Sequence, residues 1–320
     1  MRILAILIFL SCISTAQAQT LGSWKRISHR TEFTLWDVTC TDSLRCYIVG
    51  DYGVIMYSTD GGESWTQKLS PNQRALRNIH FFNDSTGLIS GFNGSCYRTK
   101  DRGNSWTECP VNVPTNFAGL SAVGNTVWLC GTGGVIVKST DQGATWQTLN
   151  SGTDVAIDAI SFADASNGWA TSVQRKVLHT RDGGASWQEQ KVEEFLPITT
   201  VCARSANECW VAGYHGLLMR TIDGGQSWQQ IEAYETDFFS LKFDANGTGW
   251  AVGKRGAIVR GEDSNLRWRL HDLTTAKELH AISFLPNNQA LTVGLFGMVF
   301  KQPLLYPPPP AAPTKSTETP

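Results

Sequence analysis

Apolar residues recur along the chain in short phrases with the spacing of β-strands. One phrase has apolar residues at its first and fourth positions, and it occurs at 35–38, 76–79, 157–160, 198–201, 238–241 and 279–282. A second phrase joins two apolar runs through a turn bounded by glycines, and it is seen at 210–216, 250–259 and 291–297. Short apolar runs broken by glycine predict strands joined by tight turns. We therefore predict an all-β protein.

Tryptophan marks the period of these phrases. Trp24, Trp65, Trp106, Trp146, Trp187, Trp228 and Trp268 follow one another at steps of 40 or 41 residues. All but the first end an Asp-box phrase, S/T-x-D-x-G-x-S/T-W, which is degraded only before Trp268. In such a phrase the carboxylate accepts turn N–H groups, glycine supplies a positive φ and tryptophan packs on the strand. We interpret the repeated aspartates as structural rather than catalytic: Asp60, Asp101, Asp141, Asp182 and Asp223.

Four strands in about 40 residues are typical of one blade of a β-propeller. Six units end at Trp65 through Trp268, and a seventh unit spans three strands near 279–301. Trp24 lies one period before Trp65, so the N-terminal strand is predicted to complete the C-terminal blade. This closure of the ring would leave no open sheet edges. The prediction is a seven-bladed propeller of four-stranded blades over residues 19–303.

The two ends of the chain have different compositions. Residues 1–18 combine Arg2, an apolar run and Ala16-Gln17-Ala18, the pattern of a cleaved signal peptide. The apolar run is too short to span a bilayer, and Cys12 leaves a lipoprotein as a minor alternative. Residues 304–320 are rich in proline, serine and threonine, so we expect an extended, disordered tail. The protein is expected to be exported, either periplasmic or secreted.

Composition and charge narrow the possible ligands. A formal net charge of −1 gives no strong field toward nucleic acid or an anionic membrane. The cysteines and histidines lack the spacing of a zinc site, so neither a metal nor another cofactor is expected. No G-x-S-x-G elbow is present for an esterase. We expect a monomer.

Seven cysteines follow the signal peptide. Cys40 and Cys46 precede Trp65 by 25 and 19 residues, and Cys202 and Cys209 precede Trp228 by 26 and 19. In an exported chain this spacing predicts two disulfides, Cys40–Cys46 and Cys202–Cys209. Cys96 and Cys109 flank an Asp-box hairpin and are a third hypothetical pair. Cys130 occupies a strand position and is interpreted as a buried apolar residue.

The Asp boxes, joined to the strand pair Gly249-Trp250-Ala251-Val252-Gly253-Lys254-Arg255-Gly256-Ala257-Ile258, resemble the photosystem II stability/assembly factor family over about 21–301. The resemblance implies an exported seven-bladed propeller that, in phototrophs, binds precursor reaction-centre subunits. Photosynthetic members share an arginine-rich surface patch. Arg74, Arg77 and Arg255 match it here, whereas other blades hold Trp36, Ala118, Thr199, Phe239 and His280. The implied partner is a protein, such as a membrane-protein precursor.

The rival hypothesis is a carbohydrate-binding propeller or a glycoside hydrolase, because sialidases also carry Asp boxes. Sialidases are six-bladed enzymes with an F/Y-R-I-P segment near the start. This chain lacks such a segment. Glycoside hydrolysis needs two carboxylates on either side of the sugar. Five acidic residues lie near strand entries, but their spacing pairs none of them: Asp158, Glu193, Glu194, Asp237 and Glu278.

The loops that enter the first strand, together with those that join the second and third strands, are expected to share one face of the ring. This geometry follows from the fold class. The face differs from blade to blade, whereas the Asp-box face repeats its chemistry, so we predict that partners bind to the variable face. Its aromatic and cationic side chains are typical of protein interfaces. The predicted binding residues are Trp36, Tyr52, Arg77, Phe92, Tyr214, His215, Phe239, Lys254, Arg255, His280 and Phe296.

Overall fold

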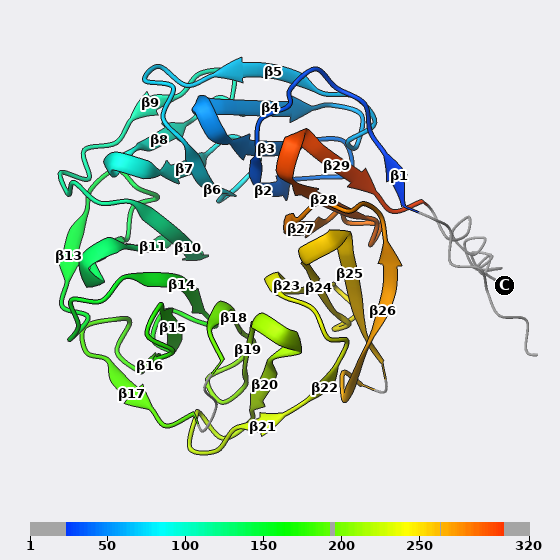
Figure 1. Cartoon of the computed structure of the whole chain (residues 1–320). Coiled ribbons are helices and arrows are strands. Elements are labelled where there is room, and N and C mark those ends of the chain that lie inside the picture. The colour runs from blue at the N-terminus through cyan, green and yellow to red at the C-terminus, as the bar shows by residue number, and fades with distance from the viewer. Residues whose placement is uncertain (1–23, 193–195, 263, 304–320) are drawn as a thin grey trace, which may run out of the picture. The chain divides into compact units, whose positions relative to one another are not determined.

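Each period of about 40 residues forms one antiparallel sheet, and seven sheets stand around a ring (Figure 1). The computed structural model describes residues 24–192, 196–262 and 264–303. The predicted signal peptide and the predicted C-terminal tail lie outside these residues. No helix among the described residues is long and apolar enough to cross a membrane. The predicted seven-bladed propeller is confirmed.

The first four blades each have four strands, listed from the centre of the ring outward. Blade 1 contains β2 (Leu35–Cys40), β3 (Cys46–Gly50), β4 (Val54–Ser58) and β5 (Thr66–Leu69). Blade 2 contains β6 (Leu76–Phe81), β7 (Gly87–Gly91), β8 (Cys96–Thr99) and β9 (Thr107–Glu108). Blade 3 contains β10 (Phe117–Val123), β11 (Thr126–Gly131), β12 (Ile136–Ser139) and β13 (Gln147–Leu149). Blade 4 contains β14 (Ile157–Phe162), β15 (Gly168–Ser172), β16 (Val177–Thr180) and β17 (Gln188–Gln190).

The remaining blades follow the same order, with two variations. Blade 5 contains β18 (Ile198–Ala203), β19 (Cys209–Gly213), β20 (Leu218–Thr221) and β21 (Gln229–Gln230). Blade 6 contains β23 (Phe238–Phe243), β24 (Gly249–Gly253), β25 (Ala257–Glu262) and β26 (Arg267–Leu273), and adds β22 (Glu232–Ala233) at its outer edge. Blade 7 contains β27 (Leu279–Phe284), β28 (Ala290–Gly294), β29 (Met298–Lys301) and, from the other end of the chain, β1 (Lys25–Arg26).

Blade 6 corrects the prediction of four strands in every blade. Residues Glu232 and Ala233 pair in parallel with Arg267 and Trp268, so this sheet has five strands. The linker from blade 5 passes along β26 before it enters β23. It therefore covers the outer edge of blade 6, which would otherwise be unpaired.

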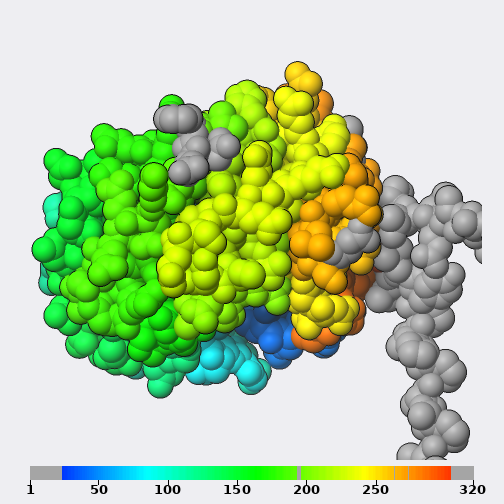
Figure 2. Space-filling view, turned by 90° about the horizontal axis from the view of Figure 1, so that it is seen from below, coloured from blue at the N-terminus to red at the C-terminus, as the bar shows by residue number. Residues whose placement is uncertain are grey.

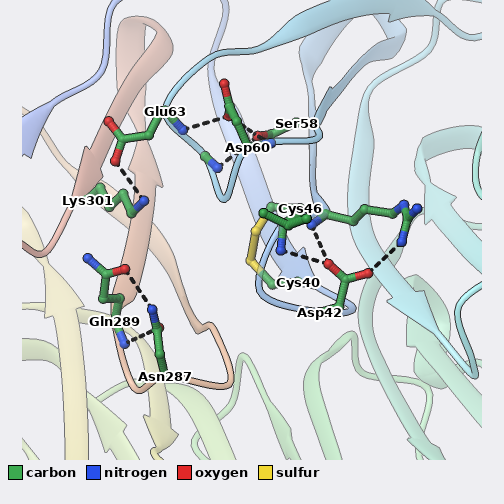
Figure 3. Close-up of a disulfide and its surroundings, with 12 residues drawn as sticks. Cys40, Asp42, Cys46, Ser58, Asp60, Glu63, Asn287, Gln289 and Lys301 are labelled. Carbon is green, nitrogen blue, oxygen red and sulfur yellow. Dashed lines mark hydrogen bonds and ion pairs between the residues drawn. A yellow bond between two sulfur atoms is a disulfide. The ribbon is translucent and has the colours of Figure 1, made fainter. Parts of the chain in front are cut away.

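The ring closes as the tryptophan spacing predicts. Lys25 pairs with Lys301, and Arg26 pairs with Phe300, in antiparallel register. Glu63, in the Asp box of blade 1, accepts hydrogen bonds from Lys25 Nζ (2.8 Å) and Lys301 Nζ (2.7 Å), as Figure 3 shows for Lys301. These hydrogen bonds also lower the pKa of Glu63. One carboxylate thus joins blade 1 to both outer strands of the closing blade.

The core lies between neighbouring blades rather than in one central cluster. The second strand of each blade is buried along its length, and its aromatic or aliphatic residues pack against the adjacent sheet. Trp128 of blade 3, for example, stacks on Phe162 of blade 4 with ring centroids 3.7 Å apart. Figure 2 shows the outer wall, where green, yellow and orange segments of successive blades follow one another. Each blade therefore depends on its neighbours for burial, as in other repeat architectures.

The Asp boxes close the outer hairpins through one repeated set of hydrogen bonds. In blade 4, the Asp182 carboxylate accepts from Thr180 Oγ1 (2.8 Å), Ser186 N (2.9 Å) and Ser186 Oγ (2.6 Å). The Ser186 hydroxyl and N–H lower the pKa of Asp182 to about 2. The four other intact boxes repeat this arrangement, including the pKa of about 2. Their carboxylates are saturated with donors from their own turns, which fits a structural role.

The cysteines form one of the predicted bridges and not another. Cys40 and Cys46 are opposite each other in blade 1 and are joined (Figure 3). The Cys202–Cys209 prediction is wrong in this structure, because both residues are free. The register places Cys209 opposite Ala203 and Cys202 opposite Trp210. Since side chains alternate along a strand, the two sulfurs point to opposite faces of the blade. One extra residue in the spacing accounts for the difference.

Cys96 and Cys109 remain a predicted pair. They are free in the structure, but their Sγ atoms lie 2.7 Å apart, between the first residue of β8 and the residue that follows β9. Oxidation needs only a small movement to reach the bond length of about 2.04 Å. We expect non-reducing peptide mapping of the exported protein to recover Cys40–Cys46 and Cys96–Cys109 as linked peptides, with Cys130, Cys202 and Cys209 as free thiols. Recovery of a Cys202–Cys209 peptide would show that the register in blade 5 is different.

Burial lowers the pKa of several histidines and makes the fold sensitive to mild acid, and the largest shifts belong to His179 and His80. His179 is 4% exposed and stacks on Trp169 at 4.1 Å, and burial lowers its pKa to about 4. Burial likewise lowers the pKa of His80 to about 4. In the unfolded chain a histidine titrates near 6.5. Between pH 6.5 and 4 the unfolded state therefore binds more protons, and stability falls as the pH falls.

This linkage is testable at His179. We expect the free energy of unfolding to decrease by on the order of 2 kcal/mol per buried histidine between pH 7 and pH 4.5. His179→Phe keeps a ring against Trp169 and removes the titrating group, so its curve should be flatter. The measurement is urea unfolding at a series of pH values. An unchanged slope in His179→Phe would exclude this histidine as a source of the acid sensitivity.

Candidate partner-binding face

Every inner strand has a β-bulge at its entrance. In β2 the register shifts between Leu35 and Asp37, and the other six inner strands shift at the same place. Bulges redirect a side chain out of the regular pleat. The redirected residues are Trp36, Arg77, Ala118, Asp158, Thr199, Phe239 and His280, and they line a cavity of about 550 Å³ at the centre of the ring. We call these seven residues the channel mouth.

Four residues of the channel mouth and Phe92 of a neighbouring turn form a continuous series of contacting planar groups. The Arg77 guanidinium lies 3.6 Å from the centre of the Trp36 ring, and Trp36 stacks on His280 at 4.2 Å. His280 in turn meets Phe239 edge-on at 5.9 Å, and Phe92 lies 5.6 Å from Arg77. Aromatic and cation–π contacts of this kind hold side chains in fixed orientations. These five residues, from blades 2, 1, 7 and 6, form the aromatic arc.

Polar contacts fix the arc in place. Trp36 Nε1 donates to Asp51 Oδ1 at 2.7 Å, and His280 Nδ1 lies 3.3 Å from the carbonyl oxygen of Leu35. Burial lowers the pKa of His280, which favours the neutral imidazole. Burial also lowers the pKa of Arg77. The arc is therefore a rigid, mainly apolar wall with one cation in it.

The other half of the channel mouth is lined by shorter side chains and is more open. Blades 3, 4 and 5 contribute Ala118, Asp158 and Thr199, which have much smaller side chains than the arc. Thr199 Oγ1 donates to the carbonyl oxygen of Phe238 at 2.5 Å. Burial raises the pKa of Asp158. The cavity is thus asymmetric, with large rings on one side and short side chains on the other.

Below the mouth, a charged pair crosses the channel. Lys242 of blade 6 lies 3.8 Å from Asp37 of blade 1. The Asp37 carboxylate also accepts from the N–H groups of Val38 (2.9 Å) and Ile79 (3.0 Å). Burial raises the pKa of Asp37, while Lys242 and these N–H groups oppose the shift. The sequence alone does not indicate this pair, because no local pattern shows that blades 1 and 6 meet at the channel.

Six turns between second and third strands surround the mouth; we call them the rim turns. They are 3-10 turns: η1 (Asp51–Gly53), η2 (Phe92–Gly94), η3 (Thr132–Gly134), η4 (Tyr214–Gly216), η5 (Lys254–Gly256) and η6 (Leu295–Gly297). The third residue is always glycine, and a Cβ at Gly134 would collide with the carbonyl oxygen of Thr153. The middle residue has a left-handed backbone, with φ of 54° or 55° at Tyr52, Asn93, His215, Arg255 and Phe296.

Left-handed backbone is costly for bulky residues. Nevertheless Tyr52 and Phe296 take it with side chains 63% and 54% exposed, where they contribute little to the core. Tyr52 contacts Phe33 at 4.6 Å, and the Lys277 ammonium lies 4.8 Å from the Phe296 ring. Such strain tends to be retained at functional positions. The rim turns therefore present large side chains to solvent at some cost in stability.

The structure brings together some of the predicted residues and separates others. Trp36, Arg77, Phe92, Phe239 and His280 form the aromatic arc. Lys254 is held by Asp237, with Nζ 2.7 Å from Oδ2, and the His215 N–H also donates to Asp237. The others lie on separate rim turns: Tyr52, Tyr214, Arg255 and Phe296.

The acidic candidates for catalysis are dispersed. Asp158 and Glu278 line the cavity, Asp237 is bound to Lys254, and Glu193 and Glu194 lie outside the described residues. No group of three or more histidine, cysteine or acidic side chains in the described part of the chain could hold a metal ion. The seven residues of the channel mouth offer aromatic contact, the imidazole of His280, the guanidinium of Arg77 and the carboxylate of Asp158.

Comparison with known proteins matches more than half of this chain to one family model. Residues 16–113, 69–154 and 144–236 match the family model described as Photosynthesis system II assembly factor YCF48. The "Photosystem II assembly lipoprotein Ycf48" of Synechococcus sp. (strain CC9902) is 29% identical over 169 residues, 51% of this chain and 50% of that protein. The chain thus matches about half the length of this curated relative.

Solved structures share the architecture at low sequence identity. "YCF48 bound to D1 peptide" has a TM-score of 0.76 at 19% identity, covering 88% of this chain and 96% of that one. YCF48 from Cyanidioschyzon merolae has a TM-score of 0.74, also at 19% identity, covering 88% and 98%. An ancestral GH74 enzyme has a TM-score of 0.69 at 15% identity, covering 87% and 46%. Identities this low show the fold alone.

Proposed function

Because this chain belongs to the family of the photosystem II assembly factor Ycf48, we propose that it is a non-catalytic propeller that binds a protein partner. In this proposal it acts as a scaffold or assembly factor for membrane or envelope proteins. The observation that carries the proposal is the concentration of the aromatic arc and the strained, exposed rim turns on one face. A relative whose structure is described as bound to the D1 peptide supports a polypeptide as ligand.

Export is part of the proposal. Residues 1–18 have the pattern of a signal peptide, and the curated relative is named a lipoprotein. We propose a periplasmic or secreted protein, with lipid attachment at Cys12 as the lesser alternative. The Cys40–Cys46 disulfide suits an oxidising compartment.

Glycoside hydrolysis is the weaker proposal. The sequence relatives are named as assembly factors, and the glycoside hydrolase among the structural neighbours shares only the fold. Polysaccharide binding without hydrolysis stays the alternative, because aromatic rings also suit sugars. An oligosaccharide recovered with the protein, in place of a polypeptide, would favour it.

The face is tested by substitutions on two rim turns. We expect Arg255→Ala combined with Tyr214→Ala to weaken partner capture by about tenfold or more, because exposed aromatic and arginine anchors dominate interfaces. The melting temperature should hardly change, since both side chains are on exposed turns. The measurement is crosslinking and quantitative pull-down from the exported compartment.

Gln226→Lys is the matched control on the Asp-box face. Gln226 is exposed and its amide bonds only to the Asp223 carbonyl oxygen of its own turn. We expect capture to be unchanged. If Gln226→Lys abolished capture while the Arg255/Tyr214 variant kept it, the partner would bind to the opposite face.

A further inference from the structure

Most charged groups that line the cavity already have a partner. Asp37 is paired with Lys242, as described above. Glu278 lies at the rim, 39% exposed, with Oε2 3.6 Å from His280 Nε2. Among the described residues of the lining, this leaves the charges of Arg77 and Asp158.

Arg77 and Asp158 face the same cavity without bonding to each other or to other described residues. The Arg77 guanidinium is held through its face by Trp36 and Phe92, and its N–H edge makes no hydrogen bond to another described residue, although it lies in the fields of Asp51, Asp158 and Asp37. Asp158, on blade 4, makes no recorded hydrogen bond or ion pair with the described part of the chain, although it feels the field of Arg77. Between them lies blade 3, which contributes only Ala118, Gly119 and Leu120 to the lining.

From this arrangement we propose that the channel mouth binds a carboxamide group, the side chain of asparagine or glutamine, inserted between Arg77 and Asp158. The inference rests on the proposed function, since it names the group that a protein partner would insert. A carboxamide carries an acceptor oxygen and an NH₂ donor on one planar group. Its oxygen accepts from the Arg77 fork, its NH₂ donates to the Asp158 carboxylate, and its methylenes lie beside the arc.

A charged ligand fits this cavity less well. A carboxylate would bond to Arg77 but would meet the like charge of Asp158. An ammonium or guanidinium would bond to Asp158 but would be repelled by Arg77. An aliphatic side chain would leave both charges without hydrogen bonds, which is costly away from water. A cavity of about 550 Å³ lies within the usual range for small-molecule sites.

The test uses four short capped peptides that differ in one side chain: acetyl-Gly-Gln-Gly-dimethylamide and its Glu, Lys and Leu counterparts, whose cap carries no primary carboxamide. Binding to the mature protein is measured by NMR titration at millimolar peptide. We expect the Gln peptide to bind about tenfold more tightly than the other three. Tighter binding of the Glu or Lys peptide, or no binding of the Gln peptide, would overturn the proposal.

Two variants separate the ligand classes. For a carboxamide, Arg77→Gln and Asp158→Asn should each weaken the Gln peptide by about tenfold, because each removes one charge-assisted hydrogen bond. For an anion, Asp158→Asn would instead tighten binding, and for a cation Arg77→Gln would do so; either result would refute the proposal. Arg102→Gln is the matched control, since Arg102 is exposed in the Asp box of the same blade and lies outside the cavity lining.

The same variants distinguish failure of this inference from failure of the proposed function. If the partner is still captured by wild type but no peptide preference is found, the carboxamide site is wrong and the partner-binding face stands. If Arg255/Tyr214 substitution leaves capture intact and the peptides also fail, both are wrong. Unchanged melting temperatures for Arg77→Gln and Asp158→Asn would show that lost binding is not a loss of folding.

Discussion

Trp24→Ala is expected to lower the free energy of unfolding by about 3–5 kcal/mol, the usual cost of removing a large buried aromatic side chain. Trp24 is only 6% exposed and meets Trp250 of blade 6 edge-on, with ring centroids 6.4 Å apart. It lies in the cluster that packs blade 6 against blade 7. Because β1 pairs with β29 through only two residues, the ring closure depends on this packing.

Equilibrium urea unfolding provides the measurement. Lys25→Ala is the matched control, at the next residue along the chain, where β1 begins. The Lys25–Glu63 ion pair is exposed on both sides, and such pairs contribute about 0–1 kcal/mol. If Trp24→Ala were as mild as Lys25→Ala, closure would be carried by backbone pairing and not by the tryptophan.

The fold could be predicted from the sequence because the information is local and repeated. The 40- or 41-residue tryptophan steps count the blades, and Trp24 identifies the strand that closes them. The fifth strand of blade 6 could not be predicted, since Glu232 and Ala233 have no strand pattern of their own. Their pairing depends on where the linker passes, which is a property of the assembled ring.

A shift of one residue in strand register also could not be predicted from the spacing of the repeats. The sequence spacing matches Cys202 to Cys40, because each precedes its predicted partner by six or seven residues. The strand register shows instead that Ala203 is the equivalent of Cys40, because Ala203 is opposite Cys209 as Cys40 is opposite Cys46. A shift of one position moves a strand side chain to the other face. The sequence spacing of 26 against 25 residues was the only available signal.

The sequence predicted many residues of the candidate site but not how they are arranged in space. The strand entries Trp36, Phe239 and His280 were named, yet their convergence depends on the bulge that redirects each of them into the channel. In the sequence, Asp158 is one of five acidic residues near strand entries, with no partner indicated by spacing. Its position opposite Arg77 became visible only when blades 2 and 4 were placed around one cavity. Contacts across the ring join residues too distant in sequence for local patterns to connect.

The second large expected effect concerns the rim turns: substitutions there should weaken partner binding without lowering stability. Tyr52, Arg255 and Phe296 each hold a left-handed backbone, which costs an L-residue about 1–2 kcal/mol, whereas glycine loses about 0.5–1 kcal/mol of unfolded-state freedom. Replacing all three with glycine should therefore leave the melting temperature unchanged or raised. Blade 3 already has Gly133 at this position with φ of 70°, so the turn accepts glycine.

Partner capture should respond in the opposite direction. The triple glycine variant removes two exposed rings and a guanidinium from the face, and anchors of this kind contribute about 2 kcal/mol or more each at interface centres. We expect capture to weaken by at least thirtyfold in the pull-down. Asn93→Gly is the control, because it relieves the same left-handed backbone while removing only a small side chain. If the triple variant melted well below wild type, the rings would be structural. If it captured partner normally, the strain in these turns would serve something other than recognition.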